Sequence, residues 1–139
     1  MAKGQAFLNV PDKTSRGNIQ HLHIIITEPD EDNNVLIVPI CSYLEDNGVP
    51  RQGQDESCIL KAGCHPFIKV KSYARYLNAK EMNLIDIFNG IQKGKLKKYQ
   101  DFDNSFVQDM QKGAEESIYL PVKFKRFFNY FIEPYNSYQ

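Results

Sequence analysis

The stretch 21–41, HLHIIITEPDEDNNVLIVPIC, decides the fold, because two apolar runs flank a short polar segment. The first run contains three consecutive isoleucines, and β-branched side chains favour a strand because they fit a pleated surface. Its unbroken apolar character predicts burial on both faces. The polar segment 30–34, DEDNN, has the Asp and Asn residues that turns prefer. The stretch therefore predicts a β-hairpin.

The residues around this hairpin predict a small antiparallel sheet. Pro39 lies inside the second apolar run and cannot donate a ladder hydrogen bond, which predicts an edge position or a bulge. Residues 43–56 are polar and contain Gly and Pro, and we expect a long loop without regular structure, of the kind that often carries function. Further short strands are predicted at 7–10, 57–60, 67–70 and 76–80.

The C-terminal third has helical spacing instead. Apolar residues recur at three- and four-residue intervals in 83–91, in a segment that Asp101 or Asp103 can cap and that runs to Lys112, and in 122–132. Residues 93–98, KGKLKK, are interpreted as a solvated basic connector. We expect one domain over 1–139 of the α+β class, mainly β. A small antiparallel β-barrel over about 1–82 would carry packed helices over about 83–132.

Composition excludes several classes of protein. The chain has 139 residues, 42% of them hydrophobic, and its 17 Lys plus Arg balance its 17 Asp plus Glu, so net charge does not indicate nucleic-acid binding. The three cysteines form no CxxC pair, which argues against a disulfide framework or a metal site. No long apolar run indicates a signal peptide or a membrane span. We expect a cytoplasmic protein without cofactor, metal or membrane partner.

The segments HLHIIITEP, VLIVPICSY and DESCIL together resemble the PemK/MazF-like toxins over about residues 17–82. The run Pro39-Ile40-Cys41-Ser42 stands where that family has a Pro-Ile-Thr/Ser motif, and His21-Leu22-His23 replaces its Gly-Arg-Arg-Pro-type loop. GCHPFIKVKSYARY is similar to a run in small bacterial and phage relatives. The resemblance implies an SH3-like barrel and a homodimeric, metal-independent endoribonuclease of a toxin–antitoxin system, neutralised by an antitoxin protein.

Cleavage of RNA without metal requires a base for the 2′-hydroxyl, an acid for the leaving oxygen and donors for the developing negative charge. Histidine suits the first two tasks, and the chain has only His21, His23 and His65. We predict His23 and His65 as acid and base, with Ser42 and Ser72 orienting phosphate. The alternative is structural: His23 half-buried and hydrogen-bonded to backbone or Ser42, and the serines engaged in turns.

Cations among aromatic residues predict a surface for single-stranded RNA, whose bases stack on rings. The candidates for this role are Arg16, Lys69, Lys71, Tyr73 and Tyr76. The alternative is an ordinary solvated strand face with the tyrosine rings packed against it.

Two functions therefore compete. The first is an endoribonuclease with RNA, an antitoxin and a second copy of the chain as partners. The second is a non-catalytic binding module on the same barrel. Their discriminator is geometric, because catalysis requires His23, Ser42 and His65 to lie together.

Overall fold

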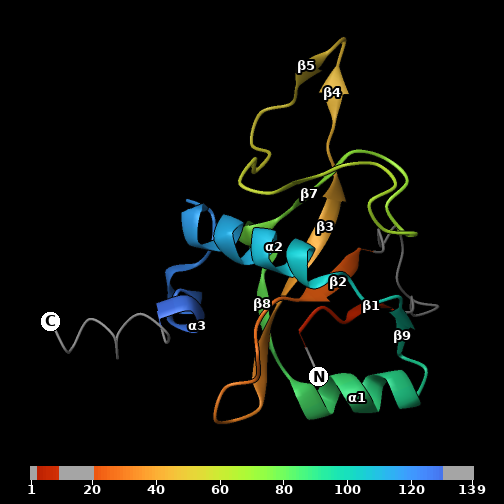
Figure 1. Cartoon of the computed structure of the whole chain (residues 1–139), viewed down its shortest axis with the longest axis vertical. Coiled ribbons are helices and arrows are strands. Elements are labelled where there is room, and N and C mark those ends of the chain that lie inside the picture. The colour runs from red at the N-terminus through yellow and green to blue at the C-terminus, as the bar shows by residue number, and fades with distance from the viewer. Residues whose placement is uncertain (1–2, 10–20, 130–139) are drawn as a thin grey trace, which may run out of the picture.

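The computed structural model describes residues 3–9 and 21–129 (Figure 1). Seven strands form one sheet with the order β6-β7-β3-β2-β1-β9, and β8 also pairs with β3. All of these pairings are antiparallel. The strands are β1 (Ala6–Asn9), β2 (Leu22–Ile25), β3 (Asn34–Ser42), β6 (Ile59–Leu60), β7 (Ser72–Ala74), β8 (Lys80–Asn83) and β9 (Leu96–Tyr99).

The predicted hairpin of residues 21–41 is confirmed as β2 and β3. Its turn is closed by the Asp30 carboxylate, which accepts hydrogen bonds from the N–H groups of Asp32 and Asn34, both at 2.9 Å. Asn33 adopts a φ of 65°, a conformation that asparagine tolerates. The nine residues of β3 then pair with β2 on one side and with both β7 and β8 on the other.

The predicted edge or bulge at Pro39 is wrong, because β3 lies inside the sheet and its register with β2 continues past Pro39. Pro39 is tolerated at the place where the partner strand changes from β7 to β8. Its carbonyl accepts the Arg75 N–H at 2.9 Å, so its nitrogen faces the same junction. A residue with an N–H at position 39 would donate to the Arg75 carbonyl. That carbonyl instead accepts the N–H of Asn78, at 3.1 Å in the 3-10 turn η1 (Tyr76–Asn78).

Side chains alternate between the two faces of the sheet along each strand, and apolar side chains occupy both faces. One surface, here the α2 face, packs against α2 (Asn104–Glu116) and the residues that follow it. The opposite surface, the α1 face, packs against α1 (Leu84–Gln92), which lies at the lower end of the sheet in Figure 1. The α2-face core includes Leu22, Ile24, Val38, Ile40, Val107 and Met110, and the α1-face core consists of Phe7, Ile25, Val35, Ile37 and Ile87.

The sheet curves without a closed ring of strands. Over residues 3–9 and 21–129 the pairings form an open path from β6 to β9, so the closed barrel that we predicted is not found. The segment after β6 nevertheless reaches the end of β9. His65 Nε2 lies 2.6 Å from the Gln100 carbonyl oxygen, and the rings of Phe67 and Tyr99 are 5.1 Å apart. The α+β class with a mainly antiparallel sheet is confirmed.

Two segments that we predicted to be irregular are strands. The polar loop 43–56 contains a second, two-stranded sheet of β4 (Glu45–Asp46) and β5 (Val49–Pro50), which projects from the main sheet (Figure 1). Asn47 and Gly48 form its turn with φ values of 54° and 80°, the pattern of a type I′ hairpin. The basic run 93–98 contributes β9 to the sheet edge. Conversely, 67–70 is not a strand, and η1 occupies most of 76–80.

The helix predictions are confirmed for α1 and α2. Asn83 caps α1 by accepting the Ile85 N–H at 3.0 Å. Helix α2 continues to Glu116, past the predicted stop at Gly113. Gly113 has a packing role instead, because the absence of a Cβ lets the helix approach Tyr76 closely. The last predicted helix is shorter, with η2 (Val122–Phe124) and α3 (Arg126–Asn129); its remainder, like residue 10, lies outside the described residues. No helix in the described parts has the length and apolar character needed to cross a membrane.

Candidate functional site

His23 lies in β2 on the α1 face and is only 8% exposed. Its ring stacks on Phe7 with centroids 5.7 Å apart. Burial, together with the positive charge of Lys80, lowers the pKa of His23 to about 4. His23 is therefore neutral near pH 7 and has no imidazolium proton to give. Its Nδ1 atom is buried and has no hydrogen-bond partner among the residues that the structure describes.

His65 lies between β6 and β7, and the fold uses both of its ring nitrogens. Nδ1 accepts the Phe67 N–H at 3.0 Å, so Nε2 carries the hydrogen and donates to the Gln100 carbonyl at 2.6 Å. The ring stacks on Phe102 at 4.0 Å and is 4% exposed. Phe102 belongs to the α2-face core. The predicted pairing of His65 with His23 in one catalytic site is wrong, because the two side chains pack against opposite faces of the sheet.

The predicted serines lie opposite each other in the register of β3 and β7. Ser72 is buried and its Oγ donates to the Val70 carbonyl at 2.8 Å, which is turn chemistry. Ser42 is exposed at the end of β3. Among the described hydrogen bonds neither serine contacts His65 or His23, so the predicted catalytic group is not assembled.

The predicted RNA-binding residues separate into buried and exposed groups. Tyr76 is fully buried and donates its hydroxyl hydrogen to the Met110 carbonyl at 2.7 Å, so the predicted stacking role is wrong. Tyr73 is 6% exposed, which leaves its ring face unable to receive a base. Lys69 and Lys71 are exposed, and Lys71 Nζ lies 4.4 Å from the Tyr43 ring centroid. Arg16 lies outside the described residues.

A different set of polar side chains meets on the α1 face, and we call it the His21 site: His21, Cys41, Tyr73 and Arg75. The register of β2 and β3, continued by one residue, places His21 opposite Cys41. Cys41 in turn pairs with Tyr73, and the Arg75 N–H bonds to the Pro39 carbonyl. Three segments distant in sequence thus present these side chains on one face, beyond the part that α1 covers.

His21 is oriented by the backbone of β3. Its Nδ1 lies 3.3 Å from the Ile40 carbonyl oxygen and 3.7 Å from Cys41 Sγ. Because a carbonyl oxygen only accepts, Nδ1 carries the hydrogen in this bond, and Nε2 is then the lone-pair nitrogen. This is the tautomer in which a histidine can receive a proton at Nε2. The side chain is half-buried, so a ligand can reach it.

Arg75 is the cation of the His21 site, and it is half-buried. Burial raises the pKa of the Cys41 thiol, and the neighbouring Arg75 charge and hydrogen bond partly offset that effect, so the thiol is protonated near pH 7. Within the described part of the chain, no carboxylate lies within 4.0 Å of the Arg75 guanidinium. A half-buried arginine without an anionic partner suits the binding of an anionic ligand.

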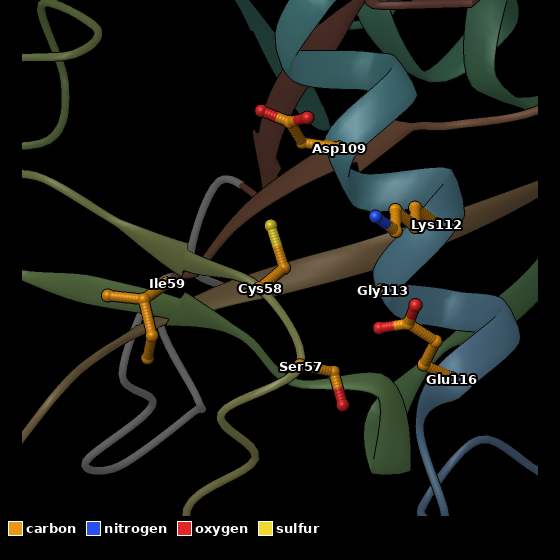
Figure 2. A pocket seen from close by; sticks show the side chains of 7 residues that line it. All are labelled: Ser57, Cys58, Ile59, Asp109, Lys112, Gly113 and Glu116. Carbon is orange, nitrogen blue, oxygen red and sulfur yellow. The ribbon is translucent and has the colours of Figure 1, made fainter.

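A pocket between residues 57–59 and α2 offers less chemistry (Figure 2). Its lining combines Lys112 with the carboxylates of Asp109 and Glu116, so charges of both signs line the pocket and it does not favour an anion. Burial raises the pKa of its Cys58 thiol to about 11, which leaves that thiol unreactive. The pocket also lacks a histidine. We therefore place the candidate site at His21.

Sequence reasoning named His21 but did not select it as catalytic, although a signal existed, and it named Arg75 only among cations near aromatic residues that could bind RNA. In an antiparallel hairpin, each step back along β2 is matched by one step forward along β3. A turn placed at 30–34 therefore also places His21 beside Cys41. Arg75 requires the β3–β7 register, which no local pattern supplies.

No three His, Cys, Asp or Glu side chains form a metal-binding group among the residues that the structure describes. No protein-family model, curated protein or solved structure matches the chain. The functional argument therefore depends on the geometry of the His21 site.

Proposed function

We propose that the protein is a metal-independent endoribonuclease that cleaves single-stranded RNA at the His21 site. One observation carries the proposal: an imidazole with Nε2 available as a base lies on the same face as the Arg75 guanidinium, which has no carboxylate within 4.0 Å in the described part of the chain. These groups meet two of the requirements of metal-independent cleavage, a base and a fixed cation.

In the proposed reaction His21 Nε2 takes the proton from a 2′-hydroxyl. The 2′-oxygen then attacks the adjacent phosphorus, and the Arg75 guanidinium binds the phosphate oxygens on which negative charge develops. The bond from phosphorus to the 5′-oxygen breaks, and the leaving oxygen takes a proton from water. The products are a 2′,3′-cyclic phosphate and a 5′-hydroxyl. The protonated Cys41 thiol lies beside both groups without adding charge.

The SH3-like barrel, the homodimer and the antitoxin of the PemK/MazF-like resemblance belong to this proposal. The contacts of His65 with Gln100 and of Phe67 with Tyr99 support barrel-like curvature, because they join the two ends of the strand path. The His21 site lies at the start of β2, where His21-Leu22-His23 replaces the family's Gly-Arg-Arg-Pro-type loop, and at the end of β3, where Pro39-Ile40-Cys41-Ser42 stands in place of the Pro-Ile-Thr/Ser motif.

A non-catalytic binding module is the second candidate, and exposed apolar residues favour it. Ile85 and Phe88, one helical turn apart in α1, are 57% and 59% exposed. Such a pair suits contact with a protein partner. Under this function RNA is not cleaved, and partner binding does not depend on His21.

The test is cleavage of single-stranded RNA with EDTA present, with Arg75→Gln, His21→Ala and the matched surface variant Lys112→Gln on α2. We expect His21→Ala to lower the rate by at least about a hundredfold, the scale of general-base catalysis, and Lys112→Gln to keep the wild-type rate. Cleavage that survives His21→Ala contradicts the proposed site. A wild-type protein that does not cleave RNA supports the binding module.

A further inference from the structure

A second cation, Lys80, lies near Arg75 on the α1 face. Lys80 pairs with Ile37 and alternates with Met82, whose side chain packs in the α1-face core. Arg75 bonds to the backbone of Pro39, two residues along β3 from Ile37. Two residues of a strand span about 7 Å, so the backbone positions of the two cations lie on the same side of β3 at about that spacing.

Neither cation has a carboxylate partner among the described residues. Lys71, Lys98 and Lys3 each lie within 4.0 Å of a carboxylate. By contrast, over residues 3–9 and 21–129, no carboxylate comes that close to Lys80 or Arg75. Lys80 is exposed and can turn toward a ligand. Two neighbouring positive charges without carboxylate partners attract an anion that carries two negative charges at a similar spacing.

His23 lies on the same face of the sheet as the two cations. It sits across β3 from Arg75, opposite Pro39, and the charge of Lys80 acts on it. Among the described residues its Nδ1 has no hydrogen-bond partner, and the side chain is only 8% exposed. Because Nδ1 is buried, a phosphate held at Lys80 acts on the His23 ring through its charge, without touching Nδ1.

We propose that Lys80, beside His23, forms a second phosphate subsite, next to the phosphate that Arg75 holds. The ligand is then an extended phosphodiester strand with two consecutive phosphates, whose separation in a single strand is similar to that of the two cations. This inference rests on the proposed function for the identity of the first phosphate. It adds the minimum length of the substrate and its placement along β3.

The experiment compares two uncleavable 2′-O-methyl ligands, a dinucleotide with one phosphate and a trinucleotide with two. Binding to the full chain is measured by fluorescence anisotropy at several salt concentrations, and the histidine ring signals are followed by NMR. The proteins are wild type, Lys80→Gln and Lys112→Gln. Lys112 on α2 provides a change of equal charge on the other side of the sheet.

We expect the second phosphate to increase wild-type affinity at least fivefold and to steepen the plot of log K against log salt by about 0.7, one single-strand contact. Lys80→Gln removes both the gain in affinity and the gain in salt dependence, whereas Lys112→Gln keeps both. The His23 NMR signals shift with the trinucleotide alone. Equal increments in Lys80→Gln, or unmoved His23 signals, overturn the subsite. If neither ligand binds wild type, the subsite is also overturned.

Cleavage assays separate this inference from the proposed function. A protein that cleaves RNA but shows no increment from the second phosphate retains its function and lacks the subsite. A protein that shows the increment and never cleaves has the subsite without the enzyme activity.

Discussion

Replacing His65 by alanine separates packing from catalysis at a residue whose sequence context suggested catalysis. The change removes the hydrogen bonds to the Phe67 N–H and the Gln100 carbonyl, and it removes the ring stacked on Phe102. An unpaired buried polar group costs about 1–3 kcal/mol, and a stacked aromatic pair contributes about 0.5–1.5 kcal/mol. Gln100 is exposed, so water replaces part of its bond. We expect a loss of about 3 kcal/mol in the free energy of unfolding.

His65→Asn is the matched variant. The asparagine oxygen can occupy the place of Nδ1 and accept the Phe67 N–H, a bond that Asn forms readily to the residue two positions on. This variant loses the stack and the bond to Gln100 only. We therefore expect about half the loss measured for His65→Ala, with the stabilities determined by urea unfolding followed by circular dichroism.

The decisive comparison is RNA cleavage per folded molecule, measured where each variant is folded. A packing role predicts the wild-type rate for His65→Asn, and for His65→Ala once its folded fraction is taken into account. Two results refute the reasoning: an unchanged unfolding free energy in His65→Ala, or a folded His65→Asn protein that has lost cleavage. Should His65→Ala fail to fold, His65→Asn still decides the matter.

Three further predictions concern stability. Because the pKa of His23 is lowered to about 4, the unfolded chain binds a proton between about pH 6.5 and 4 that the folded chain does not bind. The free energy of unfolding should therefore fall by about 2 kcal/mol from pH 7 to pH 5 in urea titrations, and His23→Asn should abolish most of this pH dependence. Gly113→Ala should cost about 1–3 kcal/mol, because its Cβ would lie 2.5 Å from Tyr76 Oη; Gly90→Ala, which meets only the movable Leu96 side chain, should cost less in the same assay. Lys125→Met should lower the melting temperature, with a cost of about 1–2 kcal/mol, because Nζ donates to three carbonyl oxygens at the end of α2; equal melting temperatures would contradict that capping role.

Local patterns predicted the elements that are stabilised locally. The hairpin of β2 and β3 follows from two β-branched runs and an Asp/Asn turn, and α1 and α2 follow from helical spacing. The arm of β4 and β5 was missed although Asn47-Gly48 is a strong hairpin signal, because its strands are short and exposed on both sides. Strand β9 was missed because lysines on an exposed sheet edge look like a solvated connector, and lysines are typical of such edges.

The candidate site was harder to predict, because it depends on which face each side chain occupies. A change of one residue in register moves a side chain to the opposite face. His65 is not in a strand, so its position depends on Phe102 and Gln100, which come much later in the chain. His21, by contrast, follows from the hairpin register alone. The predictable part of the site is the part that a single hairpin builds.

Pro39 connects the fold to the proposed ligand site. Because it has no N–H, the Arg75 carbonyl is free to accept the Asn78 N–H, and the chain leaves β3 there in the turn η1. It returns to β3 as β8 at Lys80, beside Ile37. This short detour sets Arg75 and Lys80 two β3 residues apart on one face, and two residues further in register would separate the cations by about 14 Å. The proline thus sets the spacing on which recognition of two consecutive phosphates depends.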